Sequence, residues 1–130
     1  MKKINIVFLI DDDPIHQQIA KRMIERQQVT EKIVSFLEAD LALNYIREQL
    51  YQPEFLPDLI LLDINMPVMD GWDFLEAFES FRENIPKRIL IYILTSSVNE
   101  SDMVKAKTYA SLDGYLVKPL TTETIEHLLK

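Results

Sequence analysis

Five short, continuously apolar runs constrain the fold of this chain more than any other feature. Each is rich in Ile, Leu, Val or aromatic residues, and they occupy residues 4–10, 32–36, 58–63, 88–94 and 114–117. Most lack the alternation of apolar and polar residues that a half-exposed strand shows, which is typical of strands covered on both faces. Each run therefore predicts a buried β-strand.

Segments with helical spacing follow these runs. Apolar residues recur every three or four positions at Ile15, Ile19 and Met23, at Ala42, Ile46 and Leu50, at Phe74, Phe78 and Phe81, and at Ile125, Leu128 and Leu129. A thinner apolar stripe over 99–110 predicts a marginally packed helix. The alternation predicts an α/β fold, a doubly wound five-stranded parallel sheet in a three-layer sandwich with helices on both faces.

Composition narrows the function. The 130 residues suit one domain, and their net charge of -7 argues against direct contact with nucleic acid, which needs a cationic face. The absence of cysteine excludes disulfides, thiolate metal sites and a cysteine nucleophile. We see no secretory signal and no apolar run of membrane-spanning length, so we expect a cytoplasmic protein with no membrane contact.

Polar side chains gather where four of the predicted strands end. Asp11, Asp12 and Asp13 follow the first run, Asp63 ends the third, Thr95 follows the fourth and Lys118 follows the fifth. In open parallel sheets ligands bind outside the carboxyl ends of the strands. We therefore expect these side chains to meet at one edge.

The chemistry of that set indicates phosphoryl transfer. Close approach of Asp11, Asp12 and Asp63 would raise their proton affinity or require a cation, and all-oxygen ligands suit a hard ion such as Mg²⁺. With an ammonium from Lys118 and a hydroxyl from Thr95, the set could bind a phosphoryl group around a carboxylate nucleophile.

The chain resembles the receiver domain of two-component response regulators. The acidic residues after the first run occur with "LLDINMPVMDG" (61–71), "ILTSS" (93–97) and "GYLVKP" (114–119) in the order and approximate spacing of that family. The resemblance covers nearly the whole chain and implies a flavodoxin-like (βα)5 fold. From it we expect residues 1–130 to be a single, stand-alone receiver domain with no output domain.

The resemblance also implies a role for each site residue. Asp63 would accept the phosphoryl group, and Asp11, Asp12, Asp63 and the backbone carbonyl of Asn65 would hold Mg²⁺ or Mn²⁺. Thr95 and Lys118 would contact the phosphoryl group, Thr95 and Tyr115 would act as the switch, and Asn65 and Ser97 would tune phosphoryl lifetime. The peptide bond before Pro119 is often cis in the family. The phosphoryl donor would be a histidine kinase or phosphotransfer protein, and the output would be contact with an unknown protein through the face of the fourth helix, fifth strand and fifth helix.

The sequence departs from the family pattern in three places. Ser111 and Leu112 stand where a Gly-Ala pair is usual, and glycine there relieves a left-handed helix end. The loop "YQPEFLPD" (51–58) is longer than usual, and the last helix is short.

Other polar residues have structural interpretations. Asp13 and Pro14 predict a helix start, as do Asp70–Gly71 and the pair Asn99 and Asp102. We expect His16 and His127 on solvated helix faces.

Three alternative functions stay open. A phosphohydrolase with an aspartate nucleophile would usually carry a second acid where Asn65 stands. A flavin-binding module would require a loop that binds phosphate after the first strand. The three aspartates at that position in this chain would repel the phosphate. A receiver-like domain that works only by contact, without phosphorylation, is the third.

Overall fold

The computed structural model describes residues 4–96 and 99–129, which form one sheet and its covering helices. The strands are β1 (Ile6–Ile10), β2 (Lys32–Phe36), β3 (Leu59–Asp63), β4 (Leu90–Thr95) and β5 (Gly114–Val117). The α-helices are α1 (Pro14–Arg26), α2 (Ala39–Glu48), α3 (Gly71–Glu79), α4 (Glu100–Ala106) and α5 (Thr122–Leu129). Two short 3-10 helices, η1 (Pro53–Phe55) and η2 (Arg82–Asn84), lie in the connections. Within the described residues no helix is long and apolar enough to cross a membrane.

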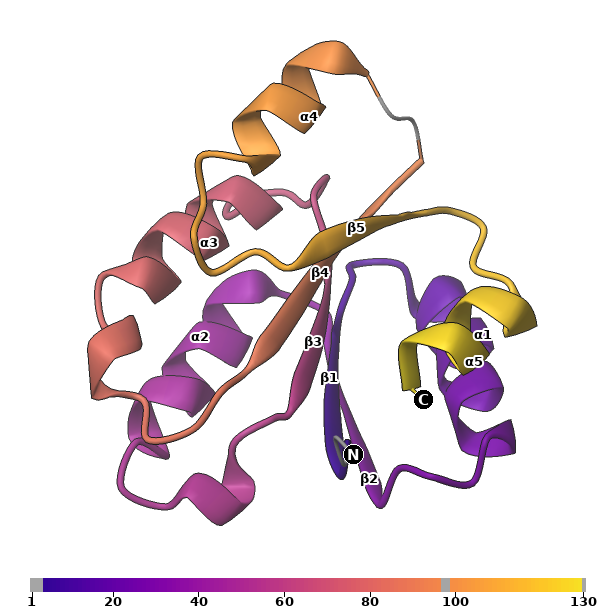
Figure 1. The fold of residues 1–130 in the computed structure, drawn as a ribbon, viewed down its shortest axis with the longest axis horizontal. Coiled ribbons are helices and arrows are strands. Elements are labelled where there is room, and N and C mark those ends of the chain that lie inside the picture. Colours follow the sequence, from indigo (N-terminus) through magenta and orange to yellow (C-terminus); the bar gives the residue numbers. More distant parts are fainter. Residues whose placement is uncertain (1–3, 97–98, 130) are drawn as a thin grey trace.

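The sheet has the strand order β2-β1-β3-β4-β5, and all neighbouring strands are parallel (Figure 1). This confirms the doubly wound α/β fold. Every residue of the central strand β3 is buried, whereas the edge strands β2 and β5 have none that is fully buried. The continuous apolar run of β3 thus reflects helices on both of its faces.

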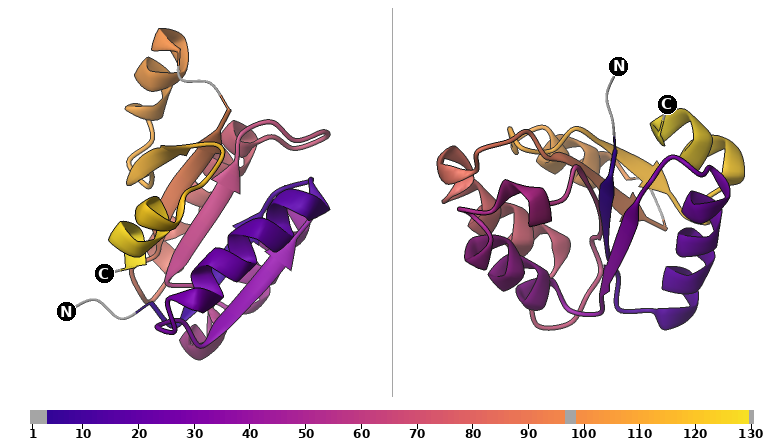
Figure 2. Two further views of the ribbon diagram at one scale, coloured as in Figure 1. Left: turned by 90° about the vertical axis from the view of Figure 1, so that its right-hand side faces the viewer. Right: turned by 90° about the horizontal axis from the view of Figure 1, so that it is seen from below.

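Two apolar clusters, one on each face of the sheet, pack the helices against the strands. Phe8, Ile60 and Ile91 point to the side of α2 and α3, while Val7, Leu9 and Leu61 point to the side of α1 and α5. Figure 2 shows the resulting three layers. Successive side chains of a strand point to opposite faces, so one apolar run supplies both clusters.

The buried face of α1 is not the face that its apolar stripe predicts. Its buried residues are Gln17, Ala20 and Ile24, whereas Ile15 and Ile19 are 69% and 47% exposed. The helix is present as predicted, but half of its apolar stripe faces solvent. The buried glutamine lies on the face of the helix that also buries Ala20 and Ile24.

The helix α4 is marginally packed, as its thin apolar stripe predicts. It ends at Ala106 rather than continuing to residue 110, and none of its residues is buried. Asn99 caps it by accepting a hydrogen bond from the Asp102 backbone N–H, which confirms that helix start. Figure 1 shows α4 projecting at one end of the molecule, beside α3.

The segment between α4 and β5 needs no glycine. In the described part of the chain the non-glycine residues with positive φ are Gln28 and Val68, so Ser111 is not left-handed. Ser111 is buried instead, and both its backbone N–H and its hydroxyl donate to Glu79 Oε2 of α3, at 2.9 and 2.7 Å. Two hydrogen bonds to α3 therefore hold this segment, at the position where the family pattern has a Gly-Ala pair.

Candidate functional site

The end of β1 presents Asp11 to the carboxyl edge of the sheet. Asp11 is buried, and the next two residues lead directly into α1, which Asp13 caps by accepting from the Ile15 and His16 backbone N–H groups. Pro14 occupies the first turn, so the predicted helix start is confirmed. The acidic triplet therefore divides into a cap and two carboxylates at the sheet edge.

Gln17 holds this edge together from α1. Its Nε2 lies 3.2, 2.9 and 2.8 Å from the carbonyl oxygens of Leu9, Asp11 and Phe36, so one amide group links the ends of β1 and β2. Sequence reasoning missed this residue, because a buried glutamine has no signal in apolar periodicity.

Asp63 ends β3 and is buried at the same edge. Its Oδ1 accepts a hydrogen bond from the Asn65 backbone N–H at 3.1 Å. The chain then returns at Gly71, where a Cβ would lie 2.9 Å from the Asp63 carbonyl oxygen. Only glycine lets α3 begin this close to Asp63, and the capping box of Asp70 and Asp73 starts the helix at that point.

Asp11, Asp12 and Asp63 form the acidic cluster. One carboxylate oxygen from each lies within 4.8 Å of the others, and no second such group of potential metal ligands occurs among residues 4–96 and 99–129. Asp12 is exposed while the other two are buried, so the cluster opens to solvent on one side. Carboxylate oxygens in this arrangement fit Mg²⁺ or Mn²⁺, which accept few protein ligands and keep several waters.

Lys118 lies between the two buried carboxylates. Its Nζ is 3.2 Å from Asp11 Oδ2 and 3.2 Å from Asp63 Oδ2. The Lys118 backbone N–H donates to the Thr95 carbonyl at 2.8 Å, which holds the residue beside the end of β4. The bond to Pro119 is cis, as the resemblance implies. One ammonium is thus divided between two carboxylates.

Electrostatics at Asp63 favour a bound cation. Burial raises the pKa of the Asp63 carboxyl, Lys118 opposes the rise, and the Asp11 charge adds to it. Ionising Asp63 in the folded protein therefore costs free energy, and a divalent ion at the cluster would lower that cost.

The remaining predicted site residues occupy different positions. Thr95 is buried at the end of β4, Asn65 is exposed directly after β3, and Tyr115 is 40% exposed on β5. The structure brings Thr95 and Asn65 to the edge that bears the acidic cluster. Ser97 lies outside the described residues.

The expectation for His16 is wrong. Rather than lying on a solvated helix face, its imidazole is half-buried, and Nδ1 lies 3.3 Å from Asp11 Oδ2. The first turn of α1 starts so soon after Asp11 that its side chains reach back over the strand end. His127 is exposed, as expected.

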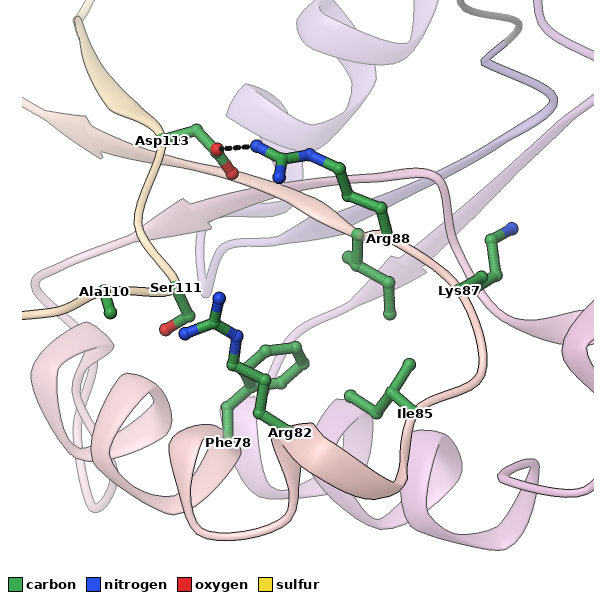
Figure 3. Close-up of a pocket in the computed structure, with 9 residues that line it drawn as sticks. Phe78, Arg82, Ile85, Lys87, Arg88, Ala110, Ser111 and Asp113 are labelled. Carbon is green, nitrogen blue, oxygen red and sulfur yellow. Dashed lines mark hydrogen bonds and ion pairs between the residues drawn. The ribbon is translucent and has the colours of Figure 1, made fainter.

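A small cavity, of about 50 Å³, lies at the site, with Asp11, His16 and Pro119 among its lining residues. A cavity of about 250 Å³ lies elsewhere, at the amino ends of β4 and β5, and Figure 3 shows Phe78, Arg82 and Arg88 among its lining residues. No member of the acidic cluster lines that cavity. The chemistry therefore depends on side chains converging at strand ends and not on a deep binding hollow.

Comparison with known proteins decides the family. The family model described as "Response regulator receiver domain" matches residues 7–130. This chain belongs to that family. Receiver domains bind Mg²⁺ at an acidic pocket and interact with histidine kinases or phosphotransfer proteins, and the family is a signalling domain rather than a classical enzyme.

This receiver domain is similar to proteins of varied length. It is 29% identical to the probable methanogenesis regulatory protein FilR2 of Methanothrix harundinacea, over 96% of this chain and 79% of that protein. Other relatives are longer. The chain spans 49% of the probable C4-dicarboxylate response regulator DctR of Halalkalibacterium halodurans and 14% of the sensor histidine kinase CheAY of Helicobacter pylori.

Solved structures share its fold. A two-component response regulator from Cytophaga hutchinsonii has 32% identity and a TM-score of 0.86, covering 98% of this chain and 95% of that one. The receiver domain of the sensor histidine kinase PA1611 from Pseudomonas aeruginosa has 21% identity and a TM-score of 0.75, covering 96% and 93%. That structure holds a magnesium ion in its active-site cleft, and at this identity the similarity extends to the fold alone.

Proposed function

We propose that this receiver domain is a phosphorylation-controlled switch in which Asp63 accepts a phosphoryl group from a histidine kinase or a phosphotransfer protein. The observation that carries the proposal is the buried Asp63 carboxylate, which shares Lys118 with Asp11 at the carboxyl edge of the sheet. A carboxylate beside an ammonium and a cation site is a nucleophile placed for phosphoryl transfer.

Each neighbour of Asp63 has a chemical task. Asp11, Asp12, Asp63 and the Asn65 carbonyl would hold Mg²⁺ or Mn²⁺, which when bound neutralises charge on the phosphoryl oxygens. Lys118 would turn from the two carboxylates toward the new phosphoryl group. Thr95, buried at the end of β4, would donate its hydroxyl, while Asn65 and Ser97 would set how long the phosphoryl group survives attack by water.

The output would be contact with another protein. Tyr115 and Val117 are partly exposed on β5, and Met103 and Val104 are partly exposed on α4, so this face carries apolar side chains on a helix with few buried contacts. An element of low local stability is easily re-positioned. We infer that Thr95 and Tyr115 transmit phosphorylation to the face of α4, β5 and α5, in a single cytoplasmic domain spanning residues 1–130 that contacts neither membrane nor nucleic acid.

The residues around Asp63 disfavour the phosphohydrolase and the flavin-binding hypotheses. A phosphohydrolase would need an acid at Asn65, and a carboxamide cannot donate and regain a proton in that role. A flavin phosphate would meet the buried Asp11 and the exposed Asp12 after β1. Contact-only signalling without phosphorylation is the remaining competitor, and it is tested directly.

The deciding experiment is intact-protein mass spectrometry after incubation with Mg²⁺ and acetyl phosphate. We expect one phosphoryl adduct that requires Mg²⁺ and is absent from Asp63→Asn. A protein that forms no adduct with acetyl phosphate or with any phosphorylated kinase domain would support the contact-only function instead, and continuous release of phosphate from phosphomonoesters would indicate a hydrolase.

Two adjacent aspartates provide a matched control. Asp12→Asn removes a carboxylate from the acidic cluster and should slow adduct formation. Asp13→Asn removes a charge one residue away but keeps an N-cap, so its adduct should form at close to the parent rate.

A further inference from the structure

His16 contacts Asp11 in a way that its place in the sequence does not predict. Its Nδ1 lies 3.3 Å from Asp11 Oδ2, and its side chain is 31% exposed. An ionised carboxylate only accepts hydrogen bonds, so Nδ1 carries the hydrogen and donates. His16 is therefore a donor to a residue of the acidic cluster.

The same carboxylate oxygen has a second donor. Lys118 Nζ lies 3.2 Å from Asp11 Oδ2 and also 3.2 Å from Asp63 Oδ2, while Asp11 Oδ1 accepts from the Asp13 backbone N–H at 3.0 Å. Asp11 thus has a fixed backbone donor on one oxygen and two side-chain donors on the other. Of these two, Lys118 is the one shared with Asp63.

We propose that His16 is a positioning residue that holds Asp11 in its place in the acidic cluster when Lys118 moves to the phosphoryl group on Asp63. This inference rests on the proposed function. Once Lys118 leaves, Asp11 Oδ2 would lose its charged partner, and a buried carboxylate with an unsatisfied oxygen is costly. The His16 donor remains, anchored on α1, and keeps the carboxylate oriented toward Asp12 and Asp63.

A purely structural role for His16 predicts different behaviour. If the imidazole only packs between α1 and the strand end, its replacement would alter stability without a specific effect on metal affinity. If the Nδ1 donor matters, a side chain with a donor at the same place should restore the function. Asparagine places its Nδ2 as far along the side chain as histidine places Nδ1, whereas leucine has similar bulk and no donor.

The test is the Mg²⁺ affinity of the unphosphorylated protein, measured by isothermal titration calorimetry. Loss of an outer hydrogen bond to a ligand weakens metal binding, so we expect His16→Leu to raise the Kd about 3-fold and His16→Asn to leave it within about 2-fold of the parent. In a Lys118→Met background, where His16 is the remaining side-chain donor to Asp11 Oδ2, His16→Leu should raise the Kd by about 10-fold.

The outcomes separate this inference from the proposed function. Equal effects of His16→Leu in both backgrounds, or equal losses in His16→Leu and His16→Asn, would overturn the inference. These titrations need no phosphoryl donor, so failure of Asp63 to accept a phosphoryl group would overturn the proposed function without changing the Kd values. If His16→Leu does not fold, His16→Met lacks the same donor and provides the same comparison.

Discussion

The two edges of the sheet use aspartate for opposite purposes. At the amino edge, Asp58 precedes β3 and accepts from the Asn5 and Ile6 backbone N–H groups, at 2.9 and 3.0 Å, and from Lys87 at 2.5 Å. Asp113 precedes β5 and accepts from the Ile91 backbone N–H and from Arg88, each at 2.9 Å; Figure 3 shows the Arg88 contact.

At the carboxyl edge the carboxylates lie close to one another instead of each having a cation of its own. Asp11 and Asp63 are more deeply buried than Asp58, yet they share Lys118 and lie beside the carboxylate of Asp12. Backbone N–H groups without partners point outward at the amino ends of parallel strands, while carbonyl groups point outward at the carboxyl ends. A carboxylate therefore stabilises the first edge and is destabilised at the second, unless a cation binds.

The largest expected effect comes from breaking the amino edge. Asp58→Ala leaves two backbone donors and Lys87 without their acceptor, so we expect a loss of about 3 kcal/mol in the free energy of unfolding, measured by urea denaturation. Glu54→Ala, on the exposed η1 segment, is the control and should change stability by less than about 0.5 kcal/mol. A loss of stability no larger than that of the control would contradict the structural role of Asp58.

The same kind of substitution at the carboxyl edge should have the opposite sign. Asp63→Asn removes a buried charge whose pKa is raised by burial, so without Mg²⁺ we expect the free energy of unfolding to increase. Mg²⁺ should raise the thermal midpoint of the parent protein more than that of Asp63→Asn, because it binds the folded parent more tightly. Equal shifts by Mg²⁺ in both proteins would show that Asp63 is not a ligand.

The difference between these two proteins should depend on pH. The folded protein binds the Asp63 proton more tightly than the unfolded chain, whose aspartates titrate near pH 3.9, so this group lowers stability as pH rises from there through its folded pKa. The advantage of Asp63→Asn in EDTA should therefore shrink as pH falls through that window. Urea midpoints of both proteins, measured in EDTA from about pH 4 to about pH 8, provide the measurement.

The smallest effect should come from the exposed member of an amino-edge pair. Arg88 is 69% exposed where it contacts Asp113, so Arg88→Gln should lower the free energy of unfolding by no more than about 0.5 kcal/mol. Asp113→Ala should lower it further, because the Ile91 N–H also loses its acceptor. A larger loss for Arg88→Gln than for Asp113→Ala would show that the ion pair, not the backbone contact, stabilises this edge.

Much of the architecture could be predicted from local patterns. The runs at 32–36 and 114–117 form strands with the predicted bounds, while the runs that begin at residues 4 and 88 enter the sheet two residues later. Asp13, Asp70 and Asn99 begin helices as predicted, because capping depends on residues within one turn. The convergence of Asp11, Asp63 and Lys118 followed from parallel topology alone.

The contacts that the sequence could not predict all cross between elements. Ser111, in the connection between α4 and β5, donates to Glu79 of α3, and the Gln17 amide donates to carbonyl groups at the ends of two strands. His16 reaches Asp11 because of how α1 leaves the sheet. Periodicity places a residue on a helix but does not give the rotation of that helix against its neighbours.

The sequence by itself determined the order of strands and helices and the polar residues at each strand end, since both depend on neighbours close along the chain. Only the tertiary structure decided that Lys118 contacts both Asp11 and Asp63, and that His16 donates to Asp11. Distances of about 3 Å depend on strand register and on the exit angle of each helix. Those quantities are set by packing over the whole molecule, so the exposed Ile15 and the half-buried His16, adjacent in sequence, have different surroundings.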